Sequence, residues 1–271
     1  MALPLRDDAP TKRTPWVTYG LILANVIVFL FIQPPAFQTS HRGVETYQEA
    51  QEVHAADRFT YSWGTVSCEI TSGKPLADHP SECHGGAPSR DLDPDKNVWA
   101  ALLTSLFIHG SWDHIAGNML FLWVFGNNVE DRLGPLAFLL FYLVGGVVAG
   151  LGYVAAHPHS IEPAIGASGA IAAVMGAYLV FRPRGRILTV VASAAFQVVY
   201  VPAFVVLGLF FVTQFLTPNS DHVAWQAHVA GMAFGAIVAL GLARIFPDPF
   251  RDKPAAPAAP TPPTAAIPDT F

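Results

Sequence analysis

Long apolar runs, separated by short polar clusters, are the feature that most limits how this chain can fold. Only 13% of the residues are charged, whereas a soluble domain carries about 25%. The runs predict an all-α polytopic membrane protein with six transmembrane helices in a lipid bilayer. They span approximately Trp16–Ile32, Trp112–Phe125, Leu136–Ala156, Ala164–Phe181, a stretch within Val198–Leu216, and Val223–Phe246.

Lys and Arg gather at one end of these helices. The loops after the third and fifth predicted spans contain neither residue, and the long loop from Gln33 to Val98 has five basic residues against ten acidic ones. By the positive-inside rule, both termini are cytoplasmic and the long first loop is extracytoplasmic. The basic residues on the cytoplasmic side are Arg6, Lys12, Arg13, Arg132, Arg182, Arg184, Arg186, Arg244, Arg251 and Lys253.

The same reading divides the chain into segments. They are a cytoplasmic N-terminal segment at 1–15, the first transmembrane helix at 16–32, an extracytoplasmic loop insertion at 33–98, a core with the other five helices at 99–246, and a disordered Pro/Ala-rich cytoplasmic tail at 247–271. Residues 187–200 are apolar and β-branched, which indicates either a cytoplasmic hairpin or an early start to the fifth span. No basic stripe interleaved with aromatic residues indicates a nucleic-acid partner.

The insertion contains the only two cysteines, Cys68 and Cys83. An even pair in an extracytoplasmic loop predicts a disulfide. His79 and His84 lie nearby, but the spacings match no strong zinc pattern, so we expect no metal. The insertion could bind a partner, shape a lateral gate, or be a stapled decoration. Decoration is the first expectation, and reduction of the bond should then leave the activity of the protein largely untouched.

A few polar side chains interrupt the apolar runs. A serine alone in such a helix is usually structural, because its hydroxyl can bond to the carbonyl one turn earlier. Ionisable groups in a span are costly and mark function more often, and His114 and His228 are two of these. Asn118 follows His114 by four residues and therefore shares its helix face. In the predicted topology these side chains and Ser168 lie within roughly 3–9 Å of the outer ends of three helices.

Small residues can bring two of these helices together. Gly231 and Gly235 form a G-x-x-x-G face on the sixth span, and the fourth span is rich in Gly and Ala. Such faces let helix backbones approach closely in lipid. We expect this approach to bring the His228 imidazole within hydrogen-bond reach of the Ser168 hydroxyl.

A serine beside a histidine is a nucleophile with its base. Acyl transfer also needs hydrogen-bond donors for the developing oxyanion. His114, the Asn118 amide and the Ser168 backbone N–H could supply them, since N–H groups at a helix start have no intrahelical acceptor. Gly166 and Gly169 keep the backbone around the serine open.

These residues resemble the rhomboid family of intramembrane serine proteases. The matching motifs are Gly166-Ala167-Ser168-Gly169 around the nucleophile, His114-x-x-x-Asn118, Ala227-His228-x-x-Gly231-x-x-x-Gly235, and an E-x-R turn at Glu130 and Arg132 within "GNNVEDRLG". The resemblance covers approximately Trp99–Phe246 and the first span by count.

The resemblance implies a six-helix rhomboid-like bundle with a catalytic Ser168–His228 dyad and no cofactor. His114, Asn118, Gly166 and the Ser168 backbone would stabilise the oxyanion. Gly169, Gly231, Gly235, Glu130 and Arg132 would be structural supports. Substrates would be single-span membrane proteins, cleaved in or near the outer leaflet.

The chain also departs from the family pattern. Some members carry an aromatic residue four positions after the nucleophile, where this chain has Ala172, and a Trp-Arg pair where it has Trp99-Ala100. The alternative function is a catalytically inactive rhomboid-like protein that binds membrane clients. Such relatives typically lack the nucleophile or the base, whereas this chain keeps Ser168 and His228, which favours the enzyme. A small transporter is a third reading. The short basic N-terminus favours a bacterial inner membrane.

Overall fold

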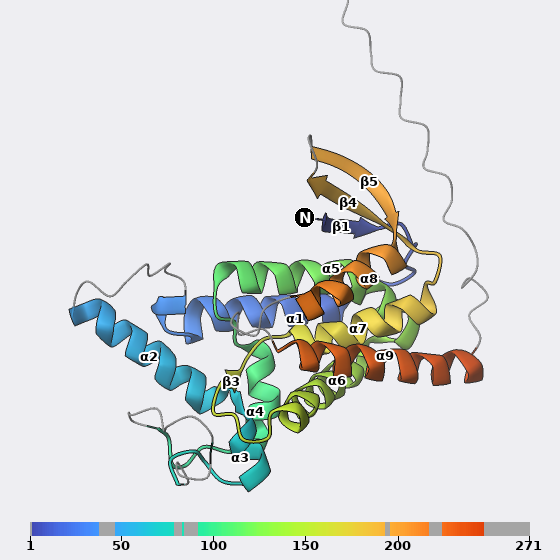
Figure 1. The fold of residues 1–271 in the computed structure, drawn as a ribbon. Helices are drawn as coiled ribbons and strands as arrows, with labels where there is room; N and C mark the ends of the chain where they lie inside the picture. Colours follow the sequence, from blue (N-terminus) through green and yellow to red (C-terminus); the bar gives the residue numbers. More distant parts are fainter. Residues whose placement is uncertain are drawn as a thin grey trace, which may run out of the picture.

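A computed structural model describes residues 2–37, 47–78, 83, 92–192, 196–216 and 224–246 of the 271-residue chain. Figure 1 shows a helical bundle with a small sheet at one side and a separate group of short elements at the other. The elements are β1 (Ala2–Asp7), α1 (Trp16–Ile27), η1 (Val28–Ile32), η2 (Pro35–Phe37), α2 (Tyr47–Trp63), β2 (Thr65–Val66), α3 (Ser67–Ser72), α4 (Val98–Thr104), η3 (Ser105–Phe107), α5 (Trp112–Leu133), α6 (Pro135–Ala156), β3 (Pro163–Ala164), α7 (Ser168–Phe181), β4 (Arg186–Ala192), β5 (Phe196–Pro202), α8 (Ala203–Leu216) and α9 (Trp225–Ile245).

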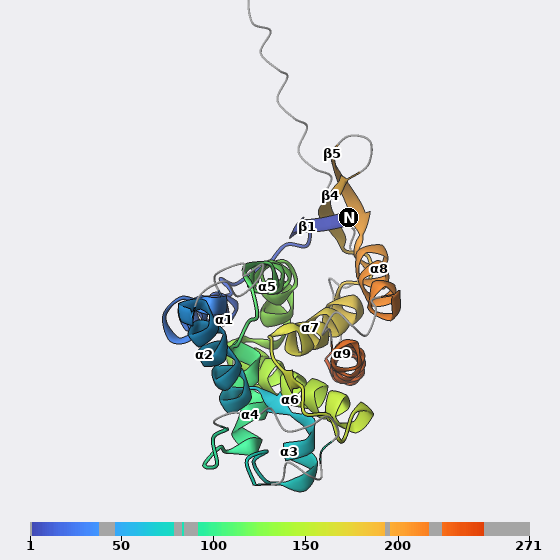
Figure 2. The same cartoon turned by 60° about the vertical axis from the view of Figure 1, so that its left-hand side comes forward.

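Helix α7 lies at the centre of the bundle, where it packs against α5, α6 and α9 (Figures 1 and 2). Its side chains are small or apolar on every side, and a helix of this kind is stable only when it is surrounded. The residues from Gly169 to Tyr178 are all buried. The first residue of this helix, Ser168, therefore has a rigid support.

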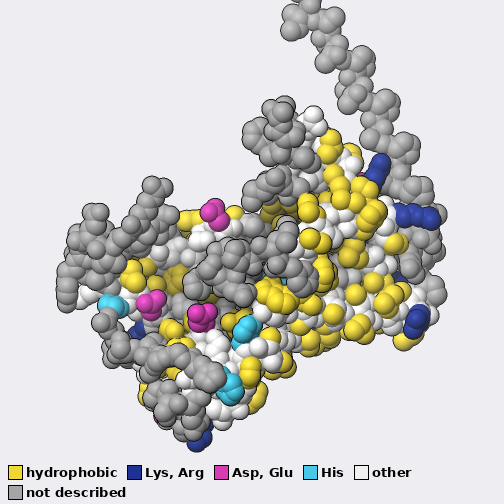
Figure 3. Space-filling model, in the orientation of Figure 1, with side chains coloured by type: hydrophobic (Ala, Val, Ile, Leu, Met, Phe, Trp, Pro, Cys, Tyr) yellow, Lys and Arg dark blue, Asp and Glu magenta, His cyan; other side chains and the backbone are white. Residues whose placement is uncertain are grey.

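The predicted predominance of helix is confirmed. In the part of the chain that the structure describes, α6 and α9 are long and apolar enough to cross a membrane. Shorter apolar helices occupy Trp16–Ile32, Val98–Phe107, Ser168–Phe181 and Ala203–Val212. On the face in Figure 3, hydrophobic side chains cover much of the part of the bundle that is not grey. Several Lys and Arg lie at the right-hand end, and Asp, Glu and His, with some Lys or Arg, lie toward the other end.

The expectation of an all-α protein is wrong at the end of the bundle that carries the N-terminus. β1, β4 and β5 form an antiparallel sheet in the order β1-β4-β5. Of the two readings of residues 187–200, the hairpin is correct, because β4 and β5 pair from Arg186↔Pro202 to Ala192↔Phe196. The β-branched side chains favour this extended pairing. The strand β1 has no such periodic signal, and the tertiary structure adds it as the third strand.

A buried carboxylate joins this sheet to the bundle. Asp7, at the end of β1, accepts hydrogen bonds at Oδ2 from Asn128 Nδ2 on α5 and from the Tyr178 hydroxyl on α7, the latter at 3.2 Å. The side chain is only 6% exposed. Burial raises the pKa of Asp7 from 3.8 to about 6, and the hydrogen bond from Tyr178 only partly opposes this. The folded protein therefore binds the proton of this carboxyl group more tightly than the unfolded chain does.

Because the folded-state pKa of Asp7 lies above its unfolded value, the free energy of unfolding should fall as pH rises from about 4 to 6. Asp7→Asn should remove this dependence, since one amide oxygen can accept both hydrogen bonds. We expect the variant to be more stable than the parent by about 1–3 kcal/mol at pH 7.5 and equal to it at pH 4. Thermal unfolding in detergent across this range, with Asp57→Asn on the exposed face of α2 as control, measures the difference. Equal shifts for both variants would contradict this account.

The insertion at 33–98 contains regular structure that the sequence did not predict. α2, β2 and α3 lie within it, and Cys68 on α3 is joined to Cys83 by a disulfide. The described residues include no group of three His, Cys, Asp or Glu that could hold a metal. His79, His84 and the tail at 247–271 lie outside the described residues.

Candidate active site

The starts of α7 and α9 bring a hydroxyl and an imidazole together. Ser168 is the first residue of α7, and His228 lies in the first turn of α9. The His228 Nε2 and Ser168 Oγ atoms are 2.7 Å apart. This distance is within the range of a hydrogen bond.

Glycines on facing helices allow this approach. A Cβ atom added to Gly231 would lie well inside 3.0 Å of the Gly169 carbonyl oxygen, and one added to Gly235 would meet the Ala173 carbonyl oxygen in the same way. Gly176 of α7 leaves equivalent room for the backbone of α9 at Met232. The two backbones are therefore in direct contact, as small-residue faces permit.

The helix that carries Ser168 starts later than the sequence predicted. The fourth span was expected from Ala164, but Pro163 and Ala164 form β3, which pairs with β2. Gly166 then takes a φ of +120°, and its N–H donates to the Ser105 carbonyl at 2.9 Å. Ser168 is therefore at the helix start rather than one turn inside it, and its N–H has no acceptor within the helix.

This bond also changes the role expected for Gly166. Its N–H is directed at Ser105 and is not available to an oxyanion. What Gly166 supplies is space, because a Cβ atom at this position would lie 2.7 Å from His114 Nε2 and 3.7 Å from Asn118 Nδ2. Both side chains of α5 therefore face the backbone just before Ser168.

A hydrogen bond to His114 Nδ1 defines which nitrogen of this ring carries the proton. The Gly110 N–H donates to His114 Nδ1 at 3.3 Å, so the neutral ring carries its proton on Nε2. Nε2 faces Gly166 and is therefore a donor on the side of Ser168. Ser111 caps α5 by accepting from the His114 N–H at 3.2 Å, so α5 starts at Trp112 and is separate from α4 and η3.

Asn118 completes this group of donors. It is 8% exposed, and within the described part of the chain its Nδ2 has no hydrogen-bond partner. Buried amides are usually paired, so this donor is a candidate for binding an acceptor that the protein itself does not supply. If Ser168 acts as a nucleophile, the oxyanion that forms would be such an acceptor.

We therefore expect Asn118→Ala to lower kcat by about 10²–10³-fold, the loss that follows removal of one oxyanion donor from a serine protease. KM should change little, because the bond forms in the transition state and not with the bound substrate. Steady-state cleavage of a model transmembrane substrate measures both constants. A raised KM with an unchanged kcat would place Asn118 in substrate binding instead.

Phe210 on α8 is a site residue that the sequence did not indicate. Its ring centroid is 6.0 Å from that of His228. Ala172, where some rhomboid proteins have an aromatic residue, is fully buried within α7. The His228 ring therefore has an aromatic neighbour from a different helix. A phenylalanine in an apolar helix carries no motif, so only the packing of α8 could reveal it.

The other predicted supports bind backbone groups. Glu130 accepts from the N–H groups of Val17 and Thr18 at 3.0 and 2.8 Å, and from the Thr18 hydroxyl at 2.8 Å. A carboxylate at a helix N-terminus satisfies its unpaired donors. Arg132 donates to the Phe246 carbonyl and lies over the Phe181 ring. These contacts hold α1 and the end of α9 against α5.

Comparison with known proteins identifies the family to which this chain is similar. The Rhomboid domain model matches residues 96–245. The chain is 27% identical over 137 residues to RHOMBOID-like protein 9, chloroplastic, of Arabidopsis thaliana, covering 51% of this chain and 30% of the relative. It is 35% identical over 102 residues to Rhomboid-like protein 11, chloroplastic, of the same plant, covering 38% and 36%. It is 33% identical over 148 residues to Rhomboid protease GluP of Bacillus subtilis, covering 53% and 26%.

The fold and the site thus define a helical membrane protein with a serine–histidine pair at the meeting point of two helices. The match covers more than half of the chain, and the protein belongs to the rhomboid family. The chain spans about a quarter to a third of the length of the three relatives named above.

Proposed function

We propose that this protein is an intramembrane serine endopeptidase that hydrolyses peptide bonds of single-span membrane proteins in or near the outer leaflet. The observation that carries the proposal is the 2.7 Å distance between Ser168 Oγ and His228 Nε2. Family membership supports it, as does the similarity to a Bacillus subtilis relative named as a rhomboid protease.

In this mechanism His228 Nε2 takes the hydroxyl proton as Ser168 Oγ attacks the carbonyl carbon of the substrate. The oxyanion that forms accepts hydrogen bonds from Asn118 Nδ2, His114 Nε2–H and the Ser168 backbone N–H. His228 then gives its proton to the leaving amine, and an acyl group remains on Ser168. Water, activated by the same imidazole, hydrolyses this ester and restores the enzyme.

The proposed topology has six transmembrane helices: α1 with η1, α5, α6, α7, α8 and α9. Both termini would lie on the cytoplasmic side and the insertion on the opposite side. The distribution of Lys and Arg supports this orientation. The hydrophobic surface of the bundle in Figure 3 supports its place in a membrane. A bacterial inner membrane remains our prediction for the location.

Labelling with a fluorophosphonate in detergent tests the proposal. We expect one covalent adduct per chain, located on Ser168 by peptide mass spectrometry, together with cleavage of a model transmembrane substrate. The alternative is a rhomboid-like protein that binds membrane clients without cutting them. A folded preparation that is neither labelled nor able to cleave would favour this alternative.

A further inference from the structure

The 33–98 insertion contacts the chain directly before Ser168. β2 and β3 are antiparallel, with Thr65 opposite Ala164 and Val66 opposite Pro163. Gly64 lies against the same segment, since a Cβ atom added to it would be 3.0 Å from Ile165 Cγ2 and 3.3 Å from Pro163 Cβ. The insertion therefore supplies a strand that pairs with the segment leading into α7, the helix that begins at Ser168.

The hydroxyl of Thr65 extends this contact toward Ser168. Thr65 Oγ1 donates to the Ala101 carbonyl at 2.9 Å, so its bond to Ser105 Oγ at 3.0 Å has Ser105 as the donor. The Ser105 carbonyl accepts the Gly166 N–H. Thr65 and Ser105 are 2% and 6% exposed, and both line one small pocket together with Ser168. A buried chain of hydrogen bonds thus runs from the insertion to Gly166, and buried networks of this kind make the backbone rigid.

A buried ion pair fixes the start of β2. Lys96 Nζ donates to the carbonyl oxygens of Tyr61 and Gly64, at 2.7 and 2.9 Å, and pairs with the Glu69 carboxylate. The side chains of Lys96 and Glu69 are 3% and 4% exposed. Burial lowers the pKa of Lys96, whereas the Glu69 charge opposes this shift. The end of α2 is therefore held in a fixed position relative to α3.

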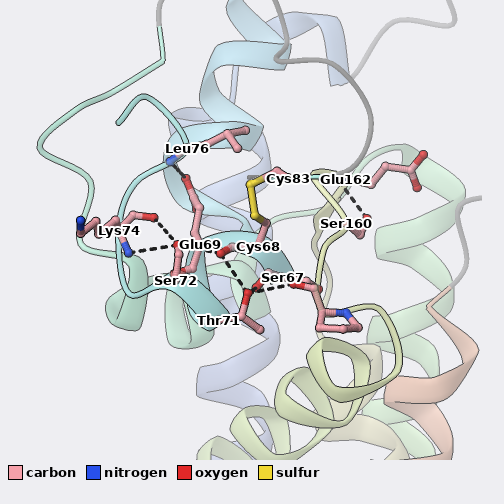
Figure 4. Close-up of a disulfide and its surroundings, with 11 residues drawn as sticks. Ser67, Cys68, Glu69, Thr71, Ser72, Lys74, Leu76, Cys83, Ser160 and Glu162 are labelled. Carbon is pink, nitrogen blue, oxygen red and sulfur yellow. Dashed lines mark hydrogen bonds between the residues drawn. A yellow bond between two sulfur atoms is a disulfide. The ribbon is translucent and has the colours of Figure 1, made fainter. Parts of the chain in front are cut away.

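The disulfide starts on α3, directly after β2. Figure 4 shows Cys68 and Thr71 of α3 beside the loop that leads from α6 to β3. The Cys68 N–H donates to the Ser160 carbonyl at 3.0 Å, and the Thr71 hydroxyl donates to the Pro158 carbonyl at 2.8 Å. Cys68 and Cys83 have Cα atoms 5.8 Å apart and are 15 residues apart in the sequence. A crosslink of this kind limits the freedom of the loop that it closes.

We propose that the insertion is a positioning element of the active site, in which β2 and Thr65 hold the Ile165–Gly166 backbone and the Cys68–Cys83 bond keeps β2 in place. Ser168 then faces His228 with its N–H turned toward the oxyanion. This inference rests on the proposed proteolytic function. It replaces the expectation that the insertion is a decoration whose reduction leaves catalysis untouched.

Thr65→Val tests the positioning role, because it keeps the shape of the side chain and removes both hydrogen bonds. We expect kcat and the rate of fluorophosphonate labelling to fall by about tenfold, since small displacements of a nucleophile cost this much or more. KM should stay within about twofold, and the midpoint of the pH–rate profile should not move, because His228 is unchanged. Thr65→Ser should restore the parent rate. The matched control is Thr60→Val. Among the described contacts, the Thr60 hydroxyl of the parent donates only to the Ala56 carbonyl of its own helix.

Reduction of the parent tests the disulfide without a substitution. Dithiothreitol donates two electrons and two protons to the Cys68–Cys83 bond, leaving two thiols and the cyclic disulfide of the reagent. We expect the labelling rate of Ser168 to fall several-fold and to recover on reoxidation. The Cys68→Ser/Cys83→Ser variant should be slow from the start and insensitive to the reagent.

The outcomes separate this inference from the proposed function. A parent that is not labelled at Ser168 would overturn both. A labelled parent whose rate is unchanged by reduction and by Thr65→Val would overturn the positioning role and leave the protease intact. If Thr65→Val does not fold, as judged by thermal unfolding, reduction of the parent decides alone.

Discussion

Replacing Ser168 with alanine is expected to abolish both fluorophosphonate labelling and cleavage of any membrane substrate. Loss of the nucleophile or the base of a serine protease lowers kcat by about 10⁶-fold, so no activity above background should remain. His228→Ala should have an effect of the same size, because its Nε2 lies 2.7 Å from the hydroxyl that it activates. The double variant should be no worse than either single one, since the two groups act as a unit.

Ser168→Ala removes only a hydroxyl oxygen, so the thermal unfolding temperature of this variant should remain close to that of the parent. His54→Ala, at an exposed position on α2, is the control for removal of an imidazole and should retain full activity. Comparative proteomics of released ectodomains, in cells with the parent or Ser168→Ala, would then identify the substrates. Cleavage that survives Ser168→Ala would exclude the proposed mechanism.

Gly231→Ala is expected to lower both the stability and the activity of the protein, although it lies outside the catalytic pair. The added Cβ would lie within 3.0 Å of the Gly169 carbonyl, which is backbone and cannot rotate away. α7 and α9 must separate to accommodate it, at a cost of about 1–3 kcal/mol of stability. The same movement takes His228 away from Ser168, and a displacement of about 1 Å can cost 10²-fold in rate.

The same helix provides a matched control for this change. Gly241, also on α9, has no atom within 4 Å of an added Cβ. Gly241→Ala should leave activity unchanged and raise helix stability slightly, because alanine favours a helix by about 1 kcal/mol over glycine. The close contact would be supported if Gly231→Ala lowers both the unfolding temperature and the activity while Gly241→Ala lowers neither. Equal behaviour would mean that α7 and α9 do not depend on it.

The sequence was most informative where the pattern was long or the spacing was specific. Apolar runs located most helices of the bundle to within a few residues, because a helix that crosses lipid must be predominantly apolar. The exception is α5, which continues past the predicted end at Phe125 to Leu133 through a charged last turn. The motifs identified the family from Ser168, His228, His114 and Asn118. The roles of these residues remain proposals until the variants are tested.

The sequence was least informative where distant segments meet. β1 and its Asp7 carry no periodic signal, and their place is decided by pairing with β4 and by the donors of Asn128 and Tyr178. α7 begins at Ser168 and not at the predicted Ala164, because Ala164 belongs to β3, which pairs with β2. Such pairing depends on contacts about 100 residues apart, which local propensity does not encode.

The sequence by itself determined that this chain forms an apolar helical bundle of the rhomboid family, because the energetic cost of polar groups in lipid restricts which residues can appear there. Only the tertiary structure showed which other residues surround the site, since Thr65 on β2 and Phe210 on α8 approach it from elements with no motif of their own. Their contributions come from position alone, and position is fixed by the packing of the whole molecule.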